Sequence, residues 1–266
     1  MELVIDVGNS ETVLGIVDPG TLDLRDHWRV STTIPRTSDE YGLLLRSLLR
    51  DSGISHDDLT MAVLGSVVPS ATRILTETLE QIVGEAPIVV DARSPLPIRL
   101  DVDEPLTVGA DRIVNTLAAK EMYGRDTVTV DLGTATTFDC ITAEGVFVGG
   151  VIAQGLESGL EWLGRKTAKL PRVELTPPER VIGRRTEECI QSGVFFSAVD
   201  AVDGIVRRIL EEWQREDVYV VATGGFATTI GPHARTVDHI EPFLTLYGLA
   251  LAGRSIRGYE AACPSH

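Results

Sequence analysis

Two segments of this chain combine an aspartate, a glycine and a threonine in the same order. DVGNSET at 6–12 and DLGTATT at 131–137 place these residues at offsets 0, +2 and +6, each time between apolar strands. Glycine and asparagine in such a turn allow positive φ and close approach, so several backbone N–H groups can surround a phosphate. The aspartate at the strand end can hold Mg²⁺ beside it, directly or through water. The pair predicts two phosphate-binding hairpins in a duplicated architecture; a chance match of a common turn sequence is the alternative.

A third glycine-rich turn, Thr223-Gly224-Gly225, follows the apolar strand predicted for residues 218–222. Two phosphate hairpins followed by such a turn resemble the layout of the actin, hexokinase and acetate kinase superfamily. In that superfamily, hairpins from both halves clamp the triphosphate and the later Gly-Gly turn meets the adenosine. The order of the three turns therefore predicts a nucleotide cleft between two halves of the chain.

The segment Gly109-Ala110-Asp111-Arg112 follows a proline-rich loop at 91–108 and begins a predicted helix. In one interpretation, Asp111 complements the positive end of the helix dipole beside a solvated arginine. In the other, Asp111 accepts a hydroxyl proton while Arg112 and the helix N–H groups hold an anionic substrate. The residue types alone leave both interpretations open.

Other nucleotide and metal motifs are not matched. Residues 159–167 (GLEWLGRKT) look like a P-loop, but Arg165 stands where a lysine is needed and the pattern is helical. No G-x-G-x-x-G follows a strand, and no G-x-S-x-G nucleophile elbow occurs. The five histidines have no metal-ligand spacing, so a zinc site is not expected.

The composition limits the class of protein. The chain has 266 residues, 43% of them hydrophobic, which allows one large or two smaller globular domains. With 24 Lys and Arg against 39 Asp and Glu, the net charge is −15, which disfavours nucleic-acid and anionic membrane partners. Three cysteines without C-x-x-C spacing, and no signal-peptide pattern, predict a cytoplasmic protein. No apolar run approaches the roughly 20 residues that span a bilayer.

The elements that must position these turns alternate between strands and helices. Strands are predicted at residues 2–7, 13–17, 61–68, 88–90, 127–130, 146–152 and 218–222. Helices are predicted at 40–52, 70–83, 110–123, 156–169, 187–210 and 244–251. This order predicts an α/β fold of two duplicated, actin-like (ribonuclease H-like) domains. We place them at 1–115 and 116–255, followed by a poorly ordered tail at 256–266.

Taken together, the motifs resemble those of the type III pantothenate kinases, from about residue 2 to residue 253. The matching segments keep the family's order, and they are DVGNSETVLG at 6–15, WRVST at 28–32, RTSDEY at 36–41, SVVP at 66–69, GADR at 109–112, DLGTATTFD at 131–139, GGVIAQG at 149–155, TAKLP at 167–171, IQSG at 190–193, ATGGF at 222–226 and LTLYGL at 244–249. The resemblance implies ATP-dependent phosphorylation of pantothenate to 4′-phosphopantothenate, the first step of coenzyme A synthesis. It favours the active-site interpretation of Asp111 over the helix cap.

The resemblance also implies roles for individual residues. Those expected to bind ATP are Asp6, Val7, Gly8, Asn9, Ser10, Glu11, Thr12, Val13, Thr134, Gly224 and Gly225, and Asp6 would help to place Mg²⁺. Asp111 is the expected general base for the primary hydroxyl of pantothenate, and Gly109, Ala110 and Arg112 would line the substrate pocket. Asp131 is the expected ligand of a monovalent cation, K⁺ or NH₄⁺. Thr186 is expected to contact pantothenate near the interface of a homodimer, in which the helix at 187–210 would take part.

Four positions depart from the family pattern. Val102 replaces a tyrosine of the pantothenate pocket, and Gln154 replaces a proline. Glu11 replaces an asparagine and adds negative charge to the first phosphate loop. Gly183-Arg184-Arg185-Thr186 stands for the usual Gly-Lys-Asn-Thr and keeps the threonine and a positive charge. These departures leave two alternatives: a catalytically weak regulatory or accessory member of the family, and a kinase for another small hydroxyl compound.

Overall fold

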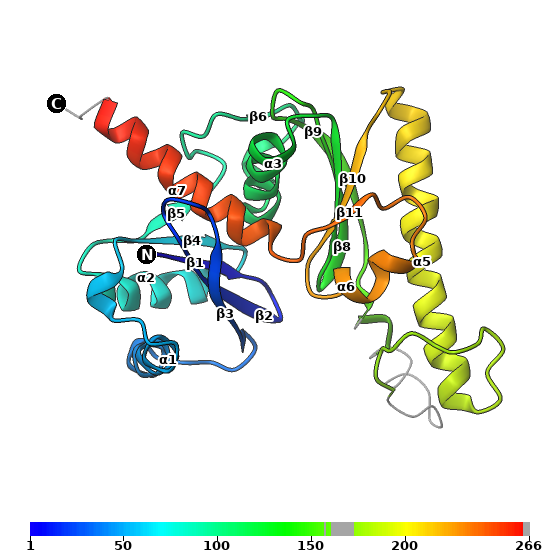
Figure 1. Cartoon of the computed structure of the whole chain (residues 1–266), viewed down its shortest axis with the longest axis horizontal. Coiled ribbons are helices and arrows are strands. Elements are labelled where there is room, and N and C mark those ends of the chain that lie inside the picture. Colours follow the sequence, from blue (N-terminus) through cyan, green and yellow to red (C-terminus); the bar gives the residue numbers. More distant parts are fainter. Residues whose placement is uncertain (157, 161–172, 263–266) are drawn as a thin grey trace. The chain divides into compact units, whose positions relative to one another are not determined.

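The computed structural model describes residues 1–156, 158–160 and 173–262, with side chains up to residue 258. Packing divides the chain into two units, Met1–Glu121 with Thr245–His266, and Met122–Leu244 (Figure 1). Three predictions fall largely outside the described residues: the P-loop-like segment from residue 161 onward, the TAKLP match at 167–171 and most of the helix predicted at 156–169.

The sheet of unit 1 has the strand order β3-β2-β1-β4-β5. Its strands are β1 (Glu2–Val7), β2 (Glu11–Val17), β3 (Leu24–Ser31), β4 (Met61–Ser66) and β5 (Ile88–Val90). β1, β2 and β3 form an antiparallel meander, whereas β4 and β5 run parallel to β1. The carboxyl ends of β1 and β4 therefore lie side by side, at the edge where ligands bind in open α/β sheets.

Two helices cover one face of this sheet, α1 (Ser38–Asp51) and α2 (Pro69–Val83). Their buried leucines pack with alternate residues of β1, β2 and β4 in one core. Thr37 begins α1 with a capping box, in which its side chain and that of Glu40 exchange hydrogen bonds with the backbone. A short η1 helix (His56–Asp58) precedes β4, and the proline-rich loop contains β6 (Arg99–Leu100) and η2 (Pro105–Thr107).

The last helix, α7 (Leu244–Ala262), packs in unit 1 rather than ending a C-terminal domain. Any side chain on Gly248 would overlap the Val114 carbonyl of α3 (Ala110–Tyr123), so the two helices approach closely. The Thr245 hydroxyl donates to Oδ1 of buried Asn115 at 3.0 Å. The predicted division at 115/116 falls inside α3, and the tail that was predicted to be poorly ordered is helical to residue 262.

The strands of unit 2 lie in the order β11-β10-β7-β8-β9. They are β7 (Thr127–Leu132), β8 (Ala135–Ile141), β9 (Val146–Gln154), β10 (Tyr219–Thr223) and β11 (His239–Ile240). As in unit 1, the first three strands are antiparallel and the next pairs parallel to the first. This repeat of topology confirms the predicted α/β fold with two related sheets.

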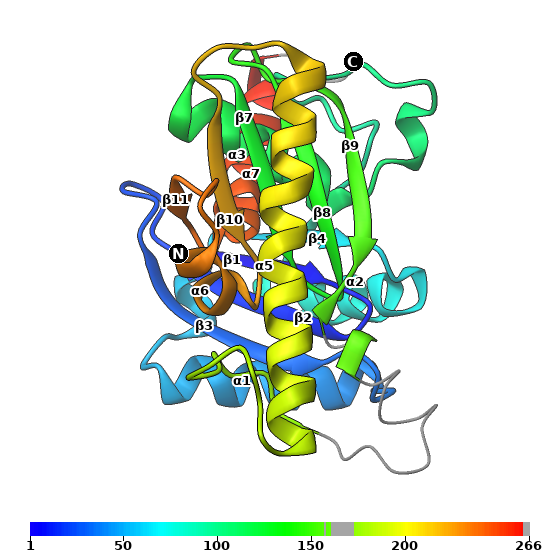
Figure 2. The same cartoon turned by 90° about the vertical axis from the view of Figure 1, so that its right-hand side faces the viewer.

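One long helix, α5 (Thr186–Trp213), lies across the sheet of unit 2 (Figure 2). Phe195, Val199, Val202 and Val206 of α5 pack on the buried valines of β7 and β10. The helix runs without interruption through Gly193. The short α6 (Ala227–Ile230) and η3 (Gly231–His233) follow β10.

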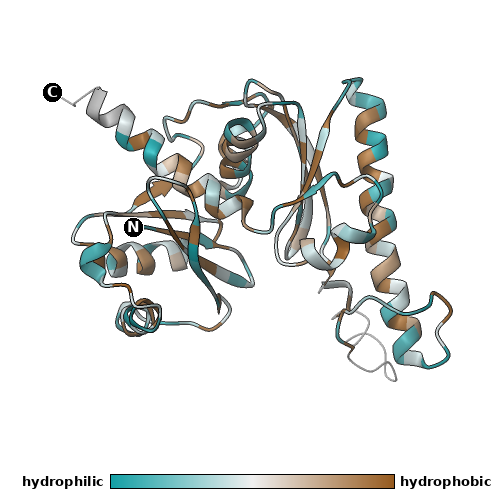
Figure 3. Cartoon of the chain, in the orientation of Figure 1, coloured by the Kyte–Doolittle hydropathy of each residue, from teal (hydrophilic) through white to brown (hydrophobic). Residues whose placement is uncertain are grey.

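Helix α5 also carries apolar residues along its length (Figure 3). Among the described residues it is the one helix long and apolar enough, by length and composition, to cross a membrane. This stretch was not predicted from the sequence, because acidic residues interrupt its apolar positions. Only 39% of the stretch is buried in the structure, although the core residues above belong to it. Other apolar side chains of α5, such as Phe196, Ile205 and Ile209, are partly buried and pack against the same core.

Candidate active site

The first predicted phosphate loop is a compact turn between β1 and β2. The Gly8 N–H donates to the Glu11 carbonyl at 3.0 Å, which closes the turn. The Ser10 carbonyl accepts from the Thr32 N–H at 2.9 Å, and the hydroxyls of Thr12 and Thr32 lie 2.8 Å apart. The segment after β3 therefore holds this turn in place. Asp6 lies half-buried at the end of β1, next to the turn.

Glu11, the acidic departure in this loop, has a cationic partner. Its Oε2 accepts from Nη1 of Arg29 on β3 at 3.0 Å, and both side chains are partly exposed. The pairing therefore offsets the negative charge that Glu11 adds to this predicted phosphate loop. Sequence reasoning missed Arg29 because strand β3 was not predicted.

The second hairpin, β7 to β8, differs from the first in register. Asp6 lies opposite Val13, whereas Asp131 lies opposite Thr137. The second turn is therefore one residue shorter, and the threonines at offset +6 are not equivalent. Because side chains alternate along a strand, Thr12 and Thr136 share the corresponding face, and both are buried. The repeat of Asp and Gly is structural, but the repeat of Thr is a coincidence of spacing.

The Gly-Gly turn after β10 meets the second hairpin within unit 2. Thr223 pairs with Asp131, and the Phe226 N–H donates to the Leu132 carbonyl at 3.0 Å. Gly224 has φ +88°, and a Cβ there would overlap Oδ1 of Asp131. A glycine is therefore required on both counts, and Asp131 lies directly against this turn. The structure brings Asp131, Thr134 and Gly224 into one part of unit 2.

Asp111 is the second residue of α3. Its Oδ1 accepts from the Arg112 N–H at 2.9 Å, so the carboxylate folds back over the start of the helix. A Cβ on Gly109 would overlap that oxygen and lie 3.4 Å from Cγ1 of Val67. The Val67 N–H in turn donates to the Val7 carbonyl at 3.1 Å. Unit 1 thus connects the candidate base to the first phosphate hairpin through the segment that follows β4.

The other predicted substrate residues of unit 1 lie nearby in the chain. Ala110 is buried and Arg112 is half-buried at the start of α3. Val102, where the family has tyrosine, is half-buried between β6 and η2.

Thr186 is the exposed first residue of α5 in unit 2. The segment before it is held by Glu188, whose Oε2 accepts from the Arg184 N–H at 2.8 Å. That hydrogen bond and the nearby Arg180 guanidinium keep the pKa of Glu188 below its ordinary value. The local geometry therefore fixes where the Gly183 to Thr186 segment enters the helix.

Asp6 and Asp131 are the candidate cation ligands. Each could supply one carboxylate to a cation whose other ligands come from the substrate and from water. No group of three or more His, Cys, Asp or Glu side chains gathers within the described ranges. Mg²⁺ in kinase sites is held by one or two carboxylates together with phosphate oxygens and water, which suits Asp6. The Asp131 carboxylate, pressed against Gly224, offers an oxygen ligand of the kind that monovalent cations accept.

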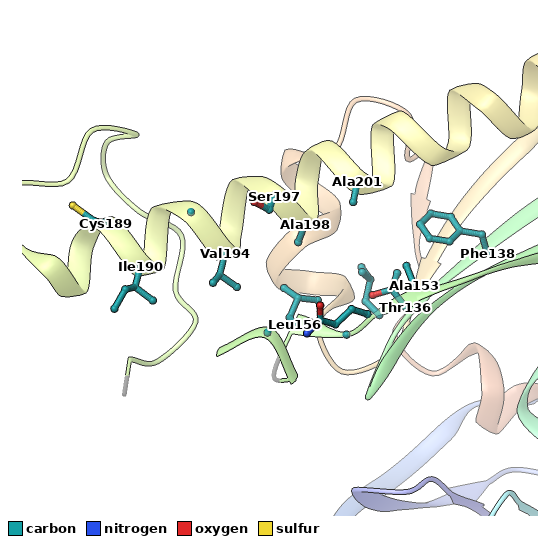
Figure 4. Close-up of a pocket in the computed structure, with 15 residues that line it drawn as sticks. Thr136, Phe138, Ala153, Leu156, Cys189, Ile190, Val194, Ser197, Ala198 and Ala201 are labelled. Atoms are coloured by element: carbon teal, nitrogen blue, oxygen red, sulfur yellow. The ribbon is translucent and has the colours of Figure 1, made fainter. Parts of the chain in front are cut away.

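A cavity of about 590 Å³ lies in unit 2 between α5 and the ends of β8 and β9 (Figure 4). Apolar side chains such as Phe138, Leu156, Ile190 and Val194 line most of it, and the lining residues that the structure describes include no charged one. None of the predicted site residues is among those that line it. We therefore assign the candidate chemistry to the hairpins and to α3, and not to this cavity.

Comparison with known proteins shows the family of this chain. Residues 2–208 match the family model of the type III pantothenate kinases. This chain belongs to that family. The type III pantothenate kinase of Moorella thermoacetica is 44% identical over 253 residues, covering 94% of this chain and 98% of that protein. That of Pelobacter propionicus is 45% identical over 251 residues, with 94% and 98% covered.

Solved structures at lower identity share the fold of this type III pantothenate kinase family member. The activator of 2-hydroxyisocaproyl-CoA dehydratase from Clostridium difficile, with bound ADPNP, has a TM-score of 0.54 at 10% identity, covering 100% of this chain and 98% of that one. Component A of the Acidaminococcus fermentans (R)-2-hydroxyglutaryl-CoA dehydratase has a TM-score of 0.55 at 14% identity, covering 97% and 98%. Their likeness concerns the fold alone.

Proposed function

We propose that this protein transfers the γ-phosphoryl group of ATP to the primary hydroxyl of pantothenate, giving 4′-phosphopantothenate and ADP. The observation that carries the proposal is the Asp111 carboxylate, fixed over Gly109 in a chain 44% identical to a type III pantothenate kinase. The test is ATP consumption by the purified protein with Mg²⁺ and K⁺, which should require pantothenate. A folded, ATP-binding protein that consumes no ATP with pantothenate, but does with another hydroxyl compound, would change the acceptor. No turnover with any acceptor would favour an accessory role.

In this proposal the hydroxyl oxygen of pantothenate bonds to the γ-phosphorus of ATP, and the bond from that phosphorus to ADP breaks. Asp111 accepts the proton that the hydroxyl loses. Gly109, Ala110 and Arg112 would line the pantothenate pocket, with the Arg112 guanidinium facing the pantothenate carboxylate. Phosphoryl transfer depends mainly on positioning and charge neutralisation. A protein of net charge −15 must supply both locally, through backbone N–H groups, a few basic side chains and bound cations.

The hairpins would hold the nucleotide. We assign the phosphates to Asp6 through Val13 and to Thr134, and the adenosine to Gly224 and Gly225. Asp6 would hold Mg²⁺, and Asp131 would hold K⁺ or NH₄⁺. Both cations, when bound, neutralise charge on the phosphates. Without K⁺ or NH₄⁺ in the assay, turnover should fall, and Na⁺ should not restore it.

Glu11 gives a prediction of its own. Replacing Glu11 by Asn, the usual family residue, should lower KM for ATP by about fivefold at low salt, since one charge near a phosphate is worth about 1 kcal/mol in water at 4 Å. The gain should shrink at 1 M salt, where the screening length is about 3 Å. Arg25→Gln, which removes a charge at another exposed ion pair of β3, is the control and should change KM little. An unchanged KM in the Glu11 variant at low salt would place Glu11 away from the phosphates.

We also propose that the protein is a cytoplasmic homodimer, without nucleic-acid or membrane partners. Val181 and Ile182 are 65% and 82% exposed, in the segment that leads into Thr186 and α5. A second copy of the chain would cover both. Ile182→Asp should shift the sedimentation coefficient from dimer to monomer, while Ile34→Asp, at an exposed apolar residue of unit 1, should not. A wild-type monomer would contradict this.

A further inference from the structure

Gly155, the residue after β9, lies against the turn of the second hairpin. A Cβ on Gly155 would overlap the Thr134 carbonyl group and lie 2.9 Å from the Gly133 carbonyl oxygen. The φ of Gly155 is not in the positive range, so the backbone conformation does not itself demand glycine. Glycine is therefore needed at position 155 for lack of space, because backbone atoms of the turn occupy the volume that a side chain would need. Backbone atoms cannot move aside as the end of a flexible side chain can.

The end of β9 and the segment after it hold the turn between β7 and β8 in place. Gln154 pairs with Ala135, which brings the end of β9 alongside the start of β8. The Gly133 N–H donates to the Ala135 carbonyl at 3.1 Å and closes the turn, while the Ser158 hydroxyl lies 3.5 Å from the Thr134 carbonyl oxygen. The Thr134 carbonyl thus faces the segment after β9. Because a trans peptide places N–H opposite C=O, the Ala135 N–H points away from Gly155.

We infer that Gly155 is a positioning residue for the nucleotide. By allowing the chain after β9 to touch the Thr134 carbonyl, it sets the orientation of the turn that, under the function proposed above, contacts ATP. Any side chain at 155 would push the Thr134 peptide and turn its amide groups away from the phosphate. Gly155 itself touches no substrate atom and acts only through the hairpin.

Gly155→Ala tests this inference. We expect its Kd for the non-hydrolysable analogue ADPNP with Mg²⁺, and its KM for ATP, to rise at least tenfold, while KM for pantothenate stays within twofold. Gly193→Ala is the matched control, since a Cβ there meets no atom within 4 Å. It should leave both nucleotide constants unchanged. A folded Gly155→Ala protein that binds ADPNP as tightly as the wild type would overturn the inference.

A second measurement covers the case in which Gly155→Ala does not fold. In the wild-type protein, ADPNP should change the amide NMR signals of residues 133–135 and leave those of the exposed α1 residues Leu43 and Arg46 unchanged. Unchanged signals at 133–135 would overturn the inference. Failure of the proposed function looks different: ATP consumption by the wild type would not depend on pantothenate, whatever the nucleotide affinity of the variant.

Discussion

Asp111→Asn is expected to lower turnover at least about a hundredfold, the usual loss when a general base is removed. Asparagine keeps the size of the side chain, and it can still accept the hydrogen bond from the Arg112 N–H that holds Asp111 at 2.9 Å. It cannot take the hydroxyl proton. KM for ATP should therefore change little, while kcat falls, as measured in steady-state assays with ATP varied at saturating pantothenate.

The matched control is Asp39→Asn. Asp39 is the second residue of α1, as Asp111 is of α3, so both replacements remove one negative charge from the first turn of a helix. If the helix dipole explained Asp111, both variants would lose similar stability and neither would lose much activity. Wild-type turnover in Asp111→Asn would remove Asp111 from the mechanism and return it to the role of a helix residue.

Arg254→Met is expected to lower the free energy of unfolding by about 3 kcal/mol, because it leaves a buried carboxylate without its charged partner. The Glu2 side chain is 5% exposed, and Arg254 donates to it from Nε and Nη2 at 3.0 and 2.8 Å. Nη2 also donates to the Asp18 carbonyl at 2.9 Å. Methionine keeps the apolar stem of the side chain, so the change isolates the charge and the hydrogen bonds. Urea unfolding followed by circular dichroism measures the loss.

Arg257→Met is the control on the same helix. Arg257 pairs with Glu85, but their side chains are 40% and 50% exposed, and an exposed pair contributes at most about 1 kcal/mol. A loss of similar size in the two variants would mean that α7 is held by its helical and apolar contacts rather than by the pair with Glu2. The double variant Glu2→Gln with Arg254→Met should recover part of the loss, since no buried charge then remains unpaired.

Local patterns in the sequence predicted most helices and strands well. Strands β1, β4, β5, β7 and β10 and helices α1, α2 and α3 fall within a few residues of their predicted positions, because their buried residues follow clear periodicities. Strand β3 was missed since its outward positions carry charged residues such as Arg25 and Arg29, and its inward positions are only half-buried. Strand β11 has two residues, too few to give any pattern.

The sequence likewise predicted some parts of the candidate site and not others. The turn sequences and GADR were visible because their chemistry lies in consecutive residues. The contacts that position them were not: Glu11 with Arg29, Asp131 with Gly224, and Gly155 with the Thr134 carbonyl each join different elements. Gly155 ends a segment that matches the family, but its spacing gave no sign of what it contacts.

The sequence by itself determined the α/β class, the two Asp-x-Gly hairpins, the family and the candidate base, since each depends on residues that are near neighbours in the chain. Only the tertiary structure decided that the second hairpin is one residue shorter, that α7 returns to unit 1, and that glycines make room for Asp111 and Asp131. The physical reason is that register and close approach depend on which backbone groups meet across strands and helices. These contacts join residues that are far apart in the sequence, so no local sequence pattern predicts them.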